Sequence, residues 1–216
     1  MSIEDSTKSE CAIIGISMLN AHFTAHNIQR TLETVKTSFS KVVFMLPDKP
    51  AEHTLEGYGY DQKDAQKTVR RKFKTLERDC RESIAGLQLP DVDIVRWEQV
   101  EQKEAYEMML KAINELYEND PSFKACIRVT TQAVYEGSKF PTKKDMTIER
   151  QIDAGIHFLF KELAFILSSP ALLGASETTY LYHKEMPVLS KLLDGTYEFT
   201  APNNVEFQRV KIHEKL

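Results

Sequence analysis

Cysteine is scarce in this chain of 216 residues, which has only Cys11, Cys80 and Cys126. They are odd in number, far apart and without the paired spacing of a zinc site, which excludes a disulfide framework and indicates a reducing compartment. Histidine offers no alternative metal site, because His22 and His26 have an i, i+4 spacing but no acidic residue or cysteine beside them. We therefore expect neither a metal nor a cofactor.

Segments that would divide or anchor the chain are also absent. No stretch rich in Pro, Gly and Ser separates two parts of it, which predicts a flexible N-terminus over residues 1–10 and one domain over residues 11–216. No apolar run reaches membrane-spanning length, and residues 1–10 are polar and acidic rather than basic and then apolar. These features predict a soluble, cytoplasmic protein without membrane contact, and we expect a monomer.

A large charge of one sign is missing as well. The net charge of −4 is too small for the whole chain to act as a polyanion-binding protein. A local basic patch nevertheless lies on the helix predicted from Asp61 to about Ala85, where the face opposite an apolar stripe carries Lys67, Arg71, Lys74, Arg78 and Arg81. Such a row can follow a phosphate backbone. The alternative is a solvated face whose bases pair with Asp64, Glu77 and Glu82.

Hydrophobic periodicity predicts alternating strands and helices. We expect strands at 12–16, 41–46, 92–97, 178–183 and 205–212, helices at 26–39, 61–85, 98–119, 121–135 and 147–167, and a loop over 47–60. The first strand, helix and strand form a βαβ unit, which requires a right-handed crossover between parallel strands. The predicted fold class is therefore α/β, with a mostly parallel sheet flanked by helices.

Polar groups gather directly after the first predicted strand. The run Cys11–Asn20 delivers Gly15, Ser17 and Asn20 at its carboxyl end. In an open α/β sheet the functional groups lie just beyond the carboxyl ends of the strands, so Ser17 is a candidate nucleophile. The alternative is a serine that only ends the strand or caps the next segment.

A single carboxylate stands on the apolar side of the helix predicted at 147–167. The residues one turn before and after Glu162 are Phe158, Leu159, Phe165 and Ile166, so its side chain projects from a face that should be buried. A buried carboxylate needs a partner, or its pKa rises, and it is more often functional than a surface carboxylate. The alternative is a structural ion pair with a lysine or arginine.

The strand predicted at 178–183 carries two tyrosines and a histidine. Tyr180 and Tyr182 share one face of this strand, and His183 takes the other. Core packing would explain one such aromatic residue adequately.

Two segments together resemble the signatures of the cyclodipeptide synthases. The first signature is histidine, any residue, two aliphatic residues, glycine, an aliphatic residue and serine, and it corresponds here to Cys11–Ser17, with Asn20 following. The second is tyrosine, an aliphatic residue, two further residues, glutamate, any residue and proline, and it corresponds to Phe158–Ala164. Tyr182 and His183, together with Asn20, are similar to the residues that mark one of the two subgroups of the family.

The resemblance implies a single Rossmann-like domain similar to the catalytic domain of the class I tyrosyl- and tryptophanyl-tRNA synthetases. It implies two aminoacyl-tRNAs as substrates and a cyclic dipeptide as product. In the implied ping-pong reaction, Ser17 takes the first aminoacyl group. A second aminoacyl-tRNA then supplies an amine that attacks the Ser17 ester, and the dipeptidyl-enzyme cyclises.

The resemblance also implies roles for individual residues. Ser17, Glu162 and Tyr182 would be catalytic, with Glu162 holding the substrate ammonium and Tyr182 transferring a proton. The substrate-binding residues would be Gly15, Asn20, Tyr106, Phe158 and His183. The basic helix would grip the tRNA acceptor stem through Lys67, Arg70, Arg71, Lys74, Arg78 and Arg81.

Three positions depart from the family pattern. Cys11 replaces the histidine and Ala164 replaces the proline, and both should be tolerated if those roles are packing. Phe158 matters more, because the family tyrosine contributes a hydroxyl to binding the substrate amino group. We expect Glu162 to contribute more to binding the substrate amino group here.

Two other functions remain open at this point. A serine hydrolase would carry Gly-x-Ser-x-Gly, and Leu19 replaces the second glycine of that motif. A non-catalytic tRNA-binding protein would need the basic helix but neither Ser17 nor Glu162. Ester hydrolysis without charged tRNA would favour the hydrolase, and tRNA binding without product would favour the binding protein.

Overall fold

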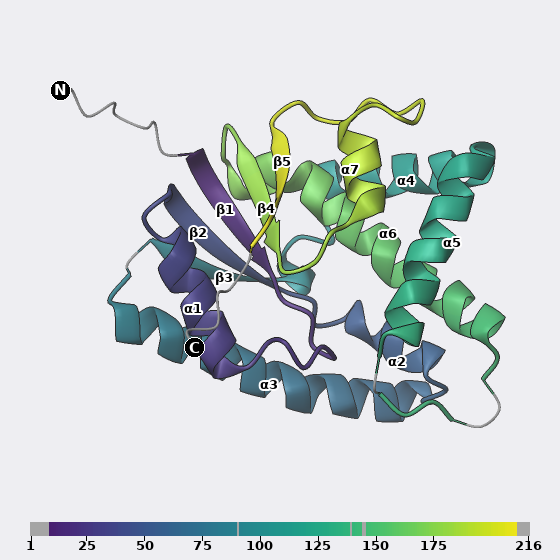
Figure 1. Cartoon of the computed structure of the whole chain (residues 1–216), viewed down its shortest axis with the longest axis horizontal. Helices are drawn as coiled ribbons and strands as arrows, with labels where there is room; N and C mark the ends of the chain where they lie inside the picture. The colour runs from purple at the N-terminus through teal and green to yellow at the C-terminus, as the bar shows by residue number, and fades with distance from the viewer. Residues whose placement is uncertain (1–8, 90, 139, 144–145, 211–216) are drawn as a thin grey trace.

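The computed structural model describes residues 9–89, 91–138, 140–143 and 146–210. Its centre is a five-stranded sheet in the order β3-β2-β1-β4-β5, in which all neighbouring strands are parallel (Figure 1). The strands are β1 (Ser9–Gly15), β2 (Phe39–Leu46), β3 (Val92–Arg96), β4 (Thr178–Tyr182) and β5 (Val205–Arg209). This arrangement confirms the predicted α/β fold with a parallel sheet.

Helices cover both faces of the sheet. They are α1 (Ala25–Val35), α2 (Ala51–Gly57), α3 (Gln62–Leu87), α4 (Glu104–Asn119), α5 (Pro121–Glu136), α6 (Ile148–Leu173) and α7 (Pro187–Leu193). α1 and α3 pack together on one face, whereas α4 to α7 lie on the other (Figure 1). α2 packs against both α3 and α6 and so connects the two layers. A parallel sheet covered in this way is typical of a Rossmann-like domain.

The central strand β1 explains why its sequence is apolar throughout. Ala12 and Ile14 pack into the core on the side of α1 and α3, and Ile13 packs on the side of α6. Side chains alternate between the faces of a strand, and helices cover both faces here. The middle of β1 therefore has no position that faces water, and its sequence reads as a continuous apolar run.

The long helix α6 forms the centre of the larger core. It begins after Thr147, whose hydroxyl accepts the backbone N–H of Arg150 as a helix cap, and it ends before Gly174, beyond the predicted end at residue 167. Its 26 residues are long and apolar enough to cross a membrane, so the expectation that no run reaches that length is wrong. However, 67% of its most apolar window is buried inside the protein. Packing against α2, α4 and α5 accounts for this composition.

Pairing in the sheet moves three predicted boundaries. Ser9 and Glu10, expected in the flexible N-terminus, form the start of β1, while residues 1–8 lie outside the described residues. The helix expected to reach Phe39 ends at Val35, and Phe39 opens β2 opposite Ser9. The last strand ends at Arg209, and residues 211–212 of its predicted range lie outside the described part.

The segment 47–60 was expected to be a loop, and it contains the helix α2. Leu55 of α2 is fully buried, and the helix packs against α6. A helix of seven residues is not stable in isolation, so this packing decides its structure. The helix expected from residue 98 begins only at Glu104, because a 3-10 turn at Trp97–Gln99 precedes it. The backbone N–H of Trp97 donates to Asp48 at 3.0 Å and holds this turn beside β2.

A buried hydrogen bond between α6 and β4 provides a test of this packing. The hydroxyls of Ser169 and Thr178, both fully buried, lie 2.7 Å apart. Ser169→Ala leaves the Thr178 hydroxyl without this partner, so we expect the free energy of unfolding to fall by about 1–3 kcal/mol. The double variant Ser169→Ala/Thr178→Val should lose no more than this, since both polar groups are then removed. Chemical denaturation measures both effects, and strictly additive losses would contradict the prediction.

Candidate active site

Ser17 lies just beyond the carboxyl end of β1. A turn follows at once, in which the backbone N–H of Asn20 donates to the carbonyl of Ser17 at 3.2 Å. β1 pairs in parallel with β4, with Ile14 opposite Leu181, so the two strands end at the same edge of the sheet. Tyr182, the last residue of β4, lies close enough to Ser17 and Asn20 for hydrogen bonding from their side chains to lower the pKa of its hydroxyl. The predicted nucleophile therefore has a phenol beside it.

The Tyr182 hydroxyl stays protonated at neutral pH. Burial raises its pKa well above the ordinary value, and the nearby carboxylate of Glu162 raises it further. The hydrogen bonds with Asn20 and Ser17 lower the pKa of Tyr182 by less than these effects raise it. A neutral phenol donates one proton while it accepts another, so Tyr182 is better suited to a proton relay than to the role of a base.

Asn20 and His183 are joined directly after β4, where the His183 ring also packs against the Tyr182 ring with centroids 4.4 Å apart. The amide oxygen of Asn20 accepts the backbone N–H of His22 at 3.0 Å, which turns its NH₂ group toward Nε2 of His183 at 3.1 Å. Nε2 must therefore accept, and the proton of the neutral His183 ring is on Nδ1. The ring also stacks on His22, with centroids 4.1 Å apart.

His183 is held in its neutral form. Burial, together with the charges of His22, Lys184 and Arg209, lowers the pKa of His183 to about 4. Nδ1 is buried and has no hydrogen-bond partner among the described residues. Protonation would place a second N–H against the NH₂ group of Asn20, so the neutral ring is the form that fits this contact.

Glu162 projects from α6 toward the tyrosines of β4. Its Oε1 accepts a hydrogen bond from the Tyr180 hydroxyl at 3.0 Å, and the Tyr180 ring stacks beside Tyr182 with centroids 6.4 Å apart. Although Glu162 keeps some exposed surface, burial raises the pKa of its carboxyl to about 7, and the Tyr180 hydrogen bond limits this rise. Within the described residues no lysine or arginine pairs with Glu162, so the structural ion pair is not the explanation there.

The absence of a side chain at Gly15 leaves the space that the Tyr180 ring occupies. Tyr180 is fully buried, and a Cβ atom at position 15 would lie 2.0 Å from its hydroxyl oxygen and 2.5 Å from its Cζ. No larger residue therefore fits at position 15 unless Tyr180 moves. The sequence predicts a substrate-binding role for Gly15, and the contact found in the structure is with Tyr180.

A family model described as cyclodipeptide synthase matches residues 4–211. The chain belongs to the cyclodipeptide synthase family. A cyclo(L-leucyl-L-leucyl) synthase of Photorhabdus laumondii is 25% identical over 197 residues, which cover 88% of this chain and 83% of the relative. A cyclo(L-leucyl-L-phenylalanyl) synthase of Streptomyces noursei is 21% identical over 222 aligned positions, in an alignment that covers 96% of this chain and 87% of that relative.

Solved structures confirm the fold. The crystal structure of a cyclo(L-leucyl-L-phenylalanyl) synthase is similar with a TM-score of 0.82 at 20% identity, covering 96% of this chain and 93% of that one. The tyrosyl-tRNA synthetase of Archaeoglobus fulgidus is similar with a TM-score of 0.52 at 13% identity, covering 91% of this chain and 54% of that one. The predicted likeness to a class I tRNA synthetase catalytic domain is therefore confirmed for the fold.

The structure brings five of the predicted site residues together. Contacts through the two tyrosines of β4 and the Asn20 side chain connect Ser17, Asn20, Glu162, Tyr182 and His183. They come from the ends of β1 and β4 and from α6. No group of three potential metal ligands gathers within the described residues, and the expectation of a metal-free site stays a prediction.

Among the described residues, no hydrogen bond or ring contact joins the predicted substrate-binding residues Tyr106 and Phe158 to this group. Tyr106 of α4 is buried, and its hydroxyl accepts the indole N–H of Trp97 at 3.0 Å. Burial raises the pKa of Tyr106 to about 12. Phe158 stands on α6 one turn before Glu162, is half-buried and has no hydroxyl. The substrate-binding roles of both residues stay predictions.

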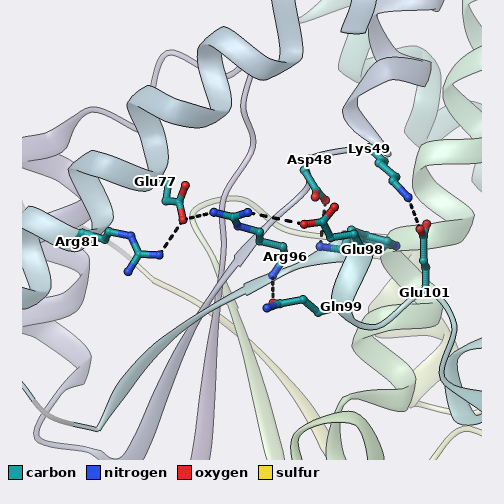
Figure 2. Close-up of polar contacts among 9 residues, drawn as sticks. Asp48, Lys49, Glu77, Arg81, Arg96, Glu98, Gln99 and Glu101 are labelled. Atoms are coloured by element: carbon teal, nitrogen blue, oxygen red, sulfur yellow. Dashed lines mark hydrogen bonds and ion pairs between the residues drawn. The ribbon is translucent and has the colours of Figure 1, made fainter.

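The predicted tRNA-binding bases fall into two sets along α3. Toward the C-terminus of the helix, Arg81 donates to Glu77 at 2.8 Å and Arg78 donates to Asp79 at 3.0 Å. Glu77 also accepts a hydrogen bond from Arg96, at the end of β3, with a distance of 2.6 Å (Figure 2). Burial raises the pKa of Glu77, but the two arginines more than offset this and hold it below its usual range. We call this the paired set.

The bases nearer the N-terminus of α3 are different. They are exposed and have no ion-pair partner in the part of the chain that the structure describes: Lys67, Arg70, Arg71 and Lys74. This half of α3 follows α2 at the carboxyl end of the sheet, which is the end that carries Ser17 (Figure 1). We call these four residues the free set. The ion pairs expected for a solvated face are therefore found in the paired set, and the tRNA-binding role of both sets stays a prediction.

Tyr180 is the site residue that the sequence analysis did not select. The alternation along β4 predicts that Tyr180 and Tyr182 share a face, and both pack on the side of α6. This shared face was the feature of the sequence that could have identified Tyr180 as a site residue. Sequence periodicity does not give the position of α6 along β4, so it cannot pair Tyr180 with Glu162.

The raised pKa of Glu162 predicts a pH dependence of stability. Folding raises this pKa from 4.5 to about 7, so the folded protein binds more protons in this range and loses stability as the pH rises through it. Glu162→Gln cannot ionise, so the variant does not lose stability in this way as the pH rises. Its amide oxygen can still accept the hydrogen bond from the Tyr180 hydroxyl. The stability of the variant relative to wild type should therefore increase with pH, by up to about 3 kcal/mol across this range.

Urea denaturation of both proteins at each pH measures this difference. All other titrating groups are common to the two proteins, so their contributions cancel. A difference in stability that does not change with pH would show that folding leaves the Glu162 pKa unperturbed.

Proposed function

We propose that this cyclodipeptide synthase uses two aminoacyl-tRNAs in a ping-pong reaction through an aminoacyl-Ser17 intermediate. The observation that carries the proposal is that Ser17 and Tyr182 lie together at the carboxyl edge of the sheet, with the Glu162 carboxylate near enough to Tyr182 to raise its pKa. Family membership supports a cyclic dipeptide as the product. The proposed enzyme acts as a cytoplasmic monomer without metal or cofactor.

In the first step the Ser17 hydroxyl attacks the ester carbonyl of an aminoacyl-tRNA. The bond between that carbonyl carbon and the ribose oxygen breaks, and an aminoacyl ester forms on Ser17. The Ser17 proton passes to Tyr182, which gives its own proton to the departing ribose oxygen. Because one proton is taken and another given, Tyr182 stays neutral, in agreement with its raised pKa.

Glu162 binds the ammonium group of the Ser17-bound residue. A neighbouring positive charge lowers a carboxyl pKa that burial has raised, so the ammonium favours the ionised form of Glu162. The ligand thereby supplies the counter-charge that the described residues do not provide. When a proton moves from the ammonium to the carboxylate, the charge pair disappears and burial again favours the protonated carboxyl. Glu162 can therefore convert the bound ammonium into the nucleophilic amine.

The remaining steps form two peptide bonds. The amine of the Ser17-bound residue attacks the ester of the second aminoacyl-tRNA, which releases that tRNA and leaves a dipeptidyl ester on Ser17. The terminal amine then attacks the Ser17 ester, the ring closes, and Ser17 regains its proton. This order differs from the one that the resemblance implied. Attack on the Ser17 ester by the second amine would release Ser17 at once, so no dipeptidyl-enzyme would form.

The free set on α3 is the proposed contact with the tRNA backbone. Its four bases occupy two turns of helix on the exposed surface, so their charges are available to phosphates. Arg78 and Arg81 are proposed as weaker contributors, because carboxylates already pair with them. This division refines the prediction that all six bases contact tRNA.

The covalent intermediate gives the most direct test. Wild-type enzyme mixed with its charged tRNA should gain one aminoacyl mass on the peptide that contains Ser17, as measured by mass spectrometry of a digest. Ser17→Ala should lose both this adduct and the cyclic dipeptide, whereas the control Ser38→Ala, at an exposed turn before β2, should keep both. An adduct on Cys11 would refute the assignment. Ester hydrolysis without cyclic dipeptide in the medium of expressing bacteria would favour the hydrolase instead.

Matched charge deletions on α3 test the tRNA contact. Arg71→Ala/Lys74→Ala should weaken binding of charged tRNA and flatten the slope of log affinity against log salt by about 1.4–1.8, at about 0.7–0.9 for each phosphate contact. Arg78→Ala/Arg81→Ala removes the same charge from the paired set and should change the slope by less than half as much. Filter binding at several salt concentrations measures both slopes.

Stability should not explain the effect of the first double variant. Arg71 and Lys74 are exposed, and such surface substitutions usually change stability by less than about 0.5 kcal/mol. Thermal unfolding provides this control. Equal salt slopes in the two double variants would disprove the division of α3 into free and paired bases.

A further inference from the structure

The carboxylate of Glu162 is fixed at one oxygen and open at the other. Oε1 accepts the Tyr180 hydroxyl at 3.0 Å. Oε2 has no hydrogen-bond partner within the described residues, and Glu162 keeps some exposed surface. Tyr180 itself is fully buried and does not reach the surface from which a substrate would enter.

We propose that Tyr180 is a positioning residue for the substrate ammonium, because its hydroxyl fixes Oε1 of Glu162 and leaves Oε2 to bind the ammonium. This role rests on the function proposed above for Glu162. A glutamate side chain has three rotatable bonds, and ordering it costs conformational entropy. A hydrogen bond that orders the carboxylate before the substrate arrives removes that cost from the binding step.

Gly15 makes this hydrogen bond possible. Tyr180 pairs with Ile13 across the two strands, and its hydroxyl reaches past that position to the backbone at Gly15. With a Cβ at position 15 only 2.0 Å from the hydroxyl oxygen, the phenol would have to move away. Glycine at this position is therefore a condition for the contact between Tyr180 and Glu162.

Because residue 158 is a phenylalanine, the hydroxyl that donates to Glu162 comes from Tyr180 of β4. Phe158 lies four residues before Glu162, on the same side of α6, and its phenyl ring has no group that donates a hydrogen bond. The support for the carboxylate comes from the neighbouring strand and not from the same helix. The structure therefore suggests a hydroxyl exchange between positions 158 and 180 as an experiment.

Titration of Glu162 in the substrate-free protein tests the hydrogen bond directly. The carboxyl signal of Glu162 is followed in ¹³C-glutamate-labelled protein and is assigned by comparison with Glu162→Gln. Its midpoint is the pH at which half of the Glu162 carboxyl is ionised. Tyr180→Phe keeps the aromatic ring but removes the hydroxyl that donates to Glu162. A carboxylate that loses a hydrogen bond ionises less readily, so the midpoint should rise by about one to two pH units. Tyr197→Phe is the control, because it removes a hydroxyl from a ring that packs on Phe123 in the same core, and the midpoint should not change.

Activity should follow the ionised fraction of Glu162. From a midpoint of about 7, a rise of one to two units lowers the ionised fraction at pH 7 from about one half to about 1–10%. We therefore expect product formation by Tyr180→Phe at this pH to fall about 5- to 50-fold. Adding Phe158→Tyr to Tyr180→Phe should lower the midpoint again and restore product, because a donor returns beside the carboxylate.

The contact between Gly15 and Tyr180 predicts that substitutions at these two positions have non-additive effects on the Glu162 midpoint. Gly15→Ala should raise the Glu162 midpoint by displacing Tyr180, and adding it to Tyr180→Phe should raise the midpoint no further. If Gly15→Ala does not fold, the comparison of Tyr180→Phe with wild type still decides the matter.

Two results would overturn the positioning role: an unchanged Glu162 midpoint in Tyr180→Phe, or a shifted midpoint with full product formation at pH 7. Failure of the proposed function has a different signature. In that case no form of the enzyme makes a cyclic dipeptide, while the Glu162 midpoint still depends on Tyr180.

Discussion

The parallel pairing of β1 with β4 is the constraint on which the whole site depends. The register that sets Ile14 opposite Leu181 brings the end of β1 to the end of β4, so Ser17 meets Tyr182 although the two are far apart in the sequence. The same register places Tyr180 against Gly15. A shift by one residue would turn both tyrosines away from α6 and from its glutamate. The sheet register is therefore as important to the chemistry as any single side chain.

Burial sets the protonation states in this site. It raises the pKa of Tyr182 and of Glu162 and lowers that of His183, so each group is driven toward its neutral form. A site that carries little charge of its own, with a carboxyl that titrates near 7, responds strongly to a cation. In the proposed function, the substrate ammonium is this cation. The stability that the folded protein gives up by burying Glu162 is consistent with a group kept for binding rather than for folding.

The basic helix α3 combines two uses of charge that its composition does not distinguish. Toward its C-terminus, Glu77 holds Arg81 and Arg96 and so ties the helix to the end of β3 (Figure 2). Toward its N-terminus the bases remain exposed and unpaired within the described residues, at the end of the sheet where Ser17 lies. One half of this element thus contributes to the structure of the domain, and the other half carries the proposed contact with tRNA.

The sequence by itself determined the elements whose signal is local: the apolar strands, the long helices α3 and α6, and the place of Ser17 just after β1. It also identified Glu162 as a carboxylate on a buried face. It did not determine α2, because a helix of seven residues is stable only when it packs against α6. It also did not determine that β2 starts at Phe39, because pairing in the sheet overrides the helical periodicity there. Only the tertiary structure decided that Tyr180 is the partner of Glu162 and which bases of α3 are neutralised. Spacing along one element fixes which side chains share a face, but contacts between elements depend on how the elements pack, and no local pattern encodes that.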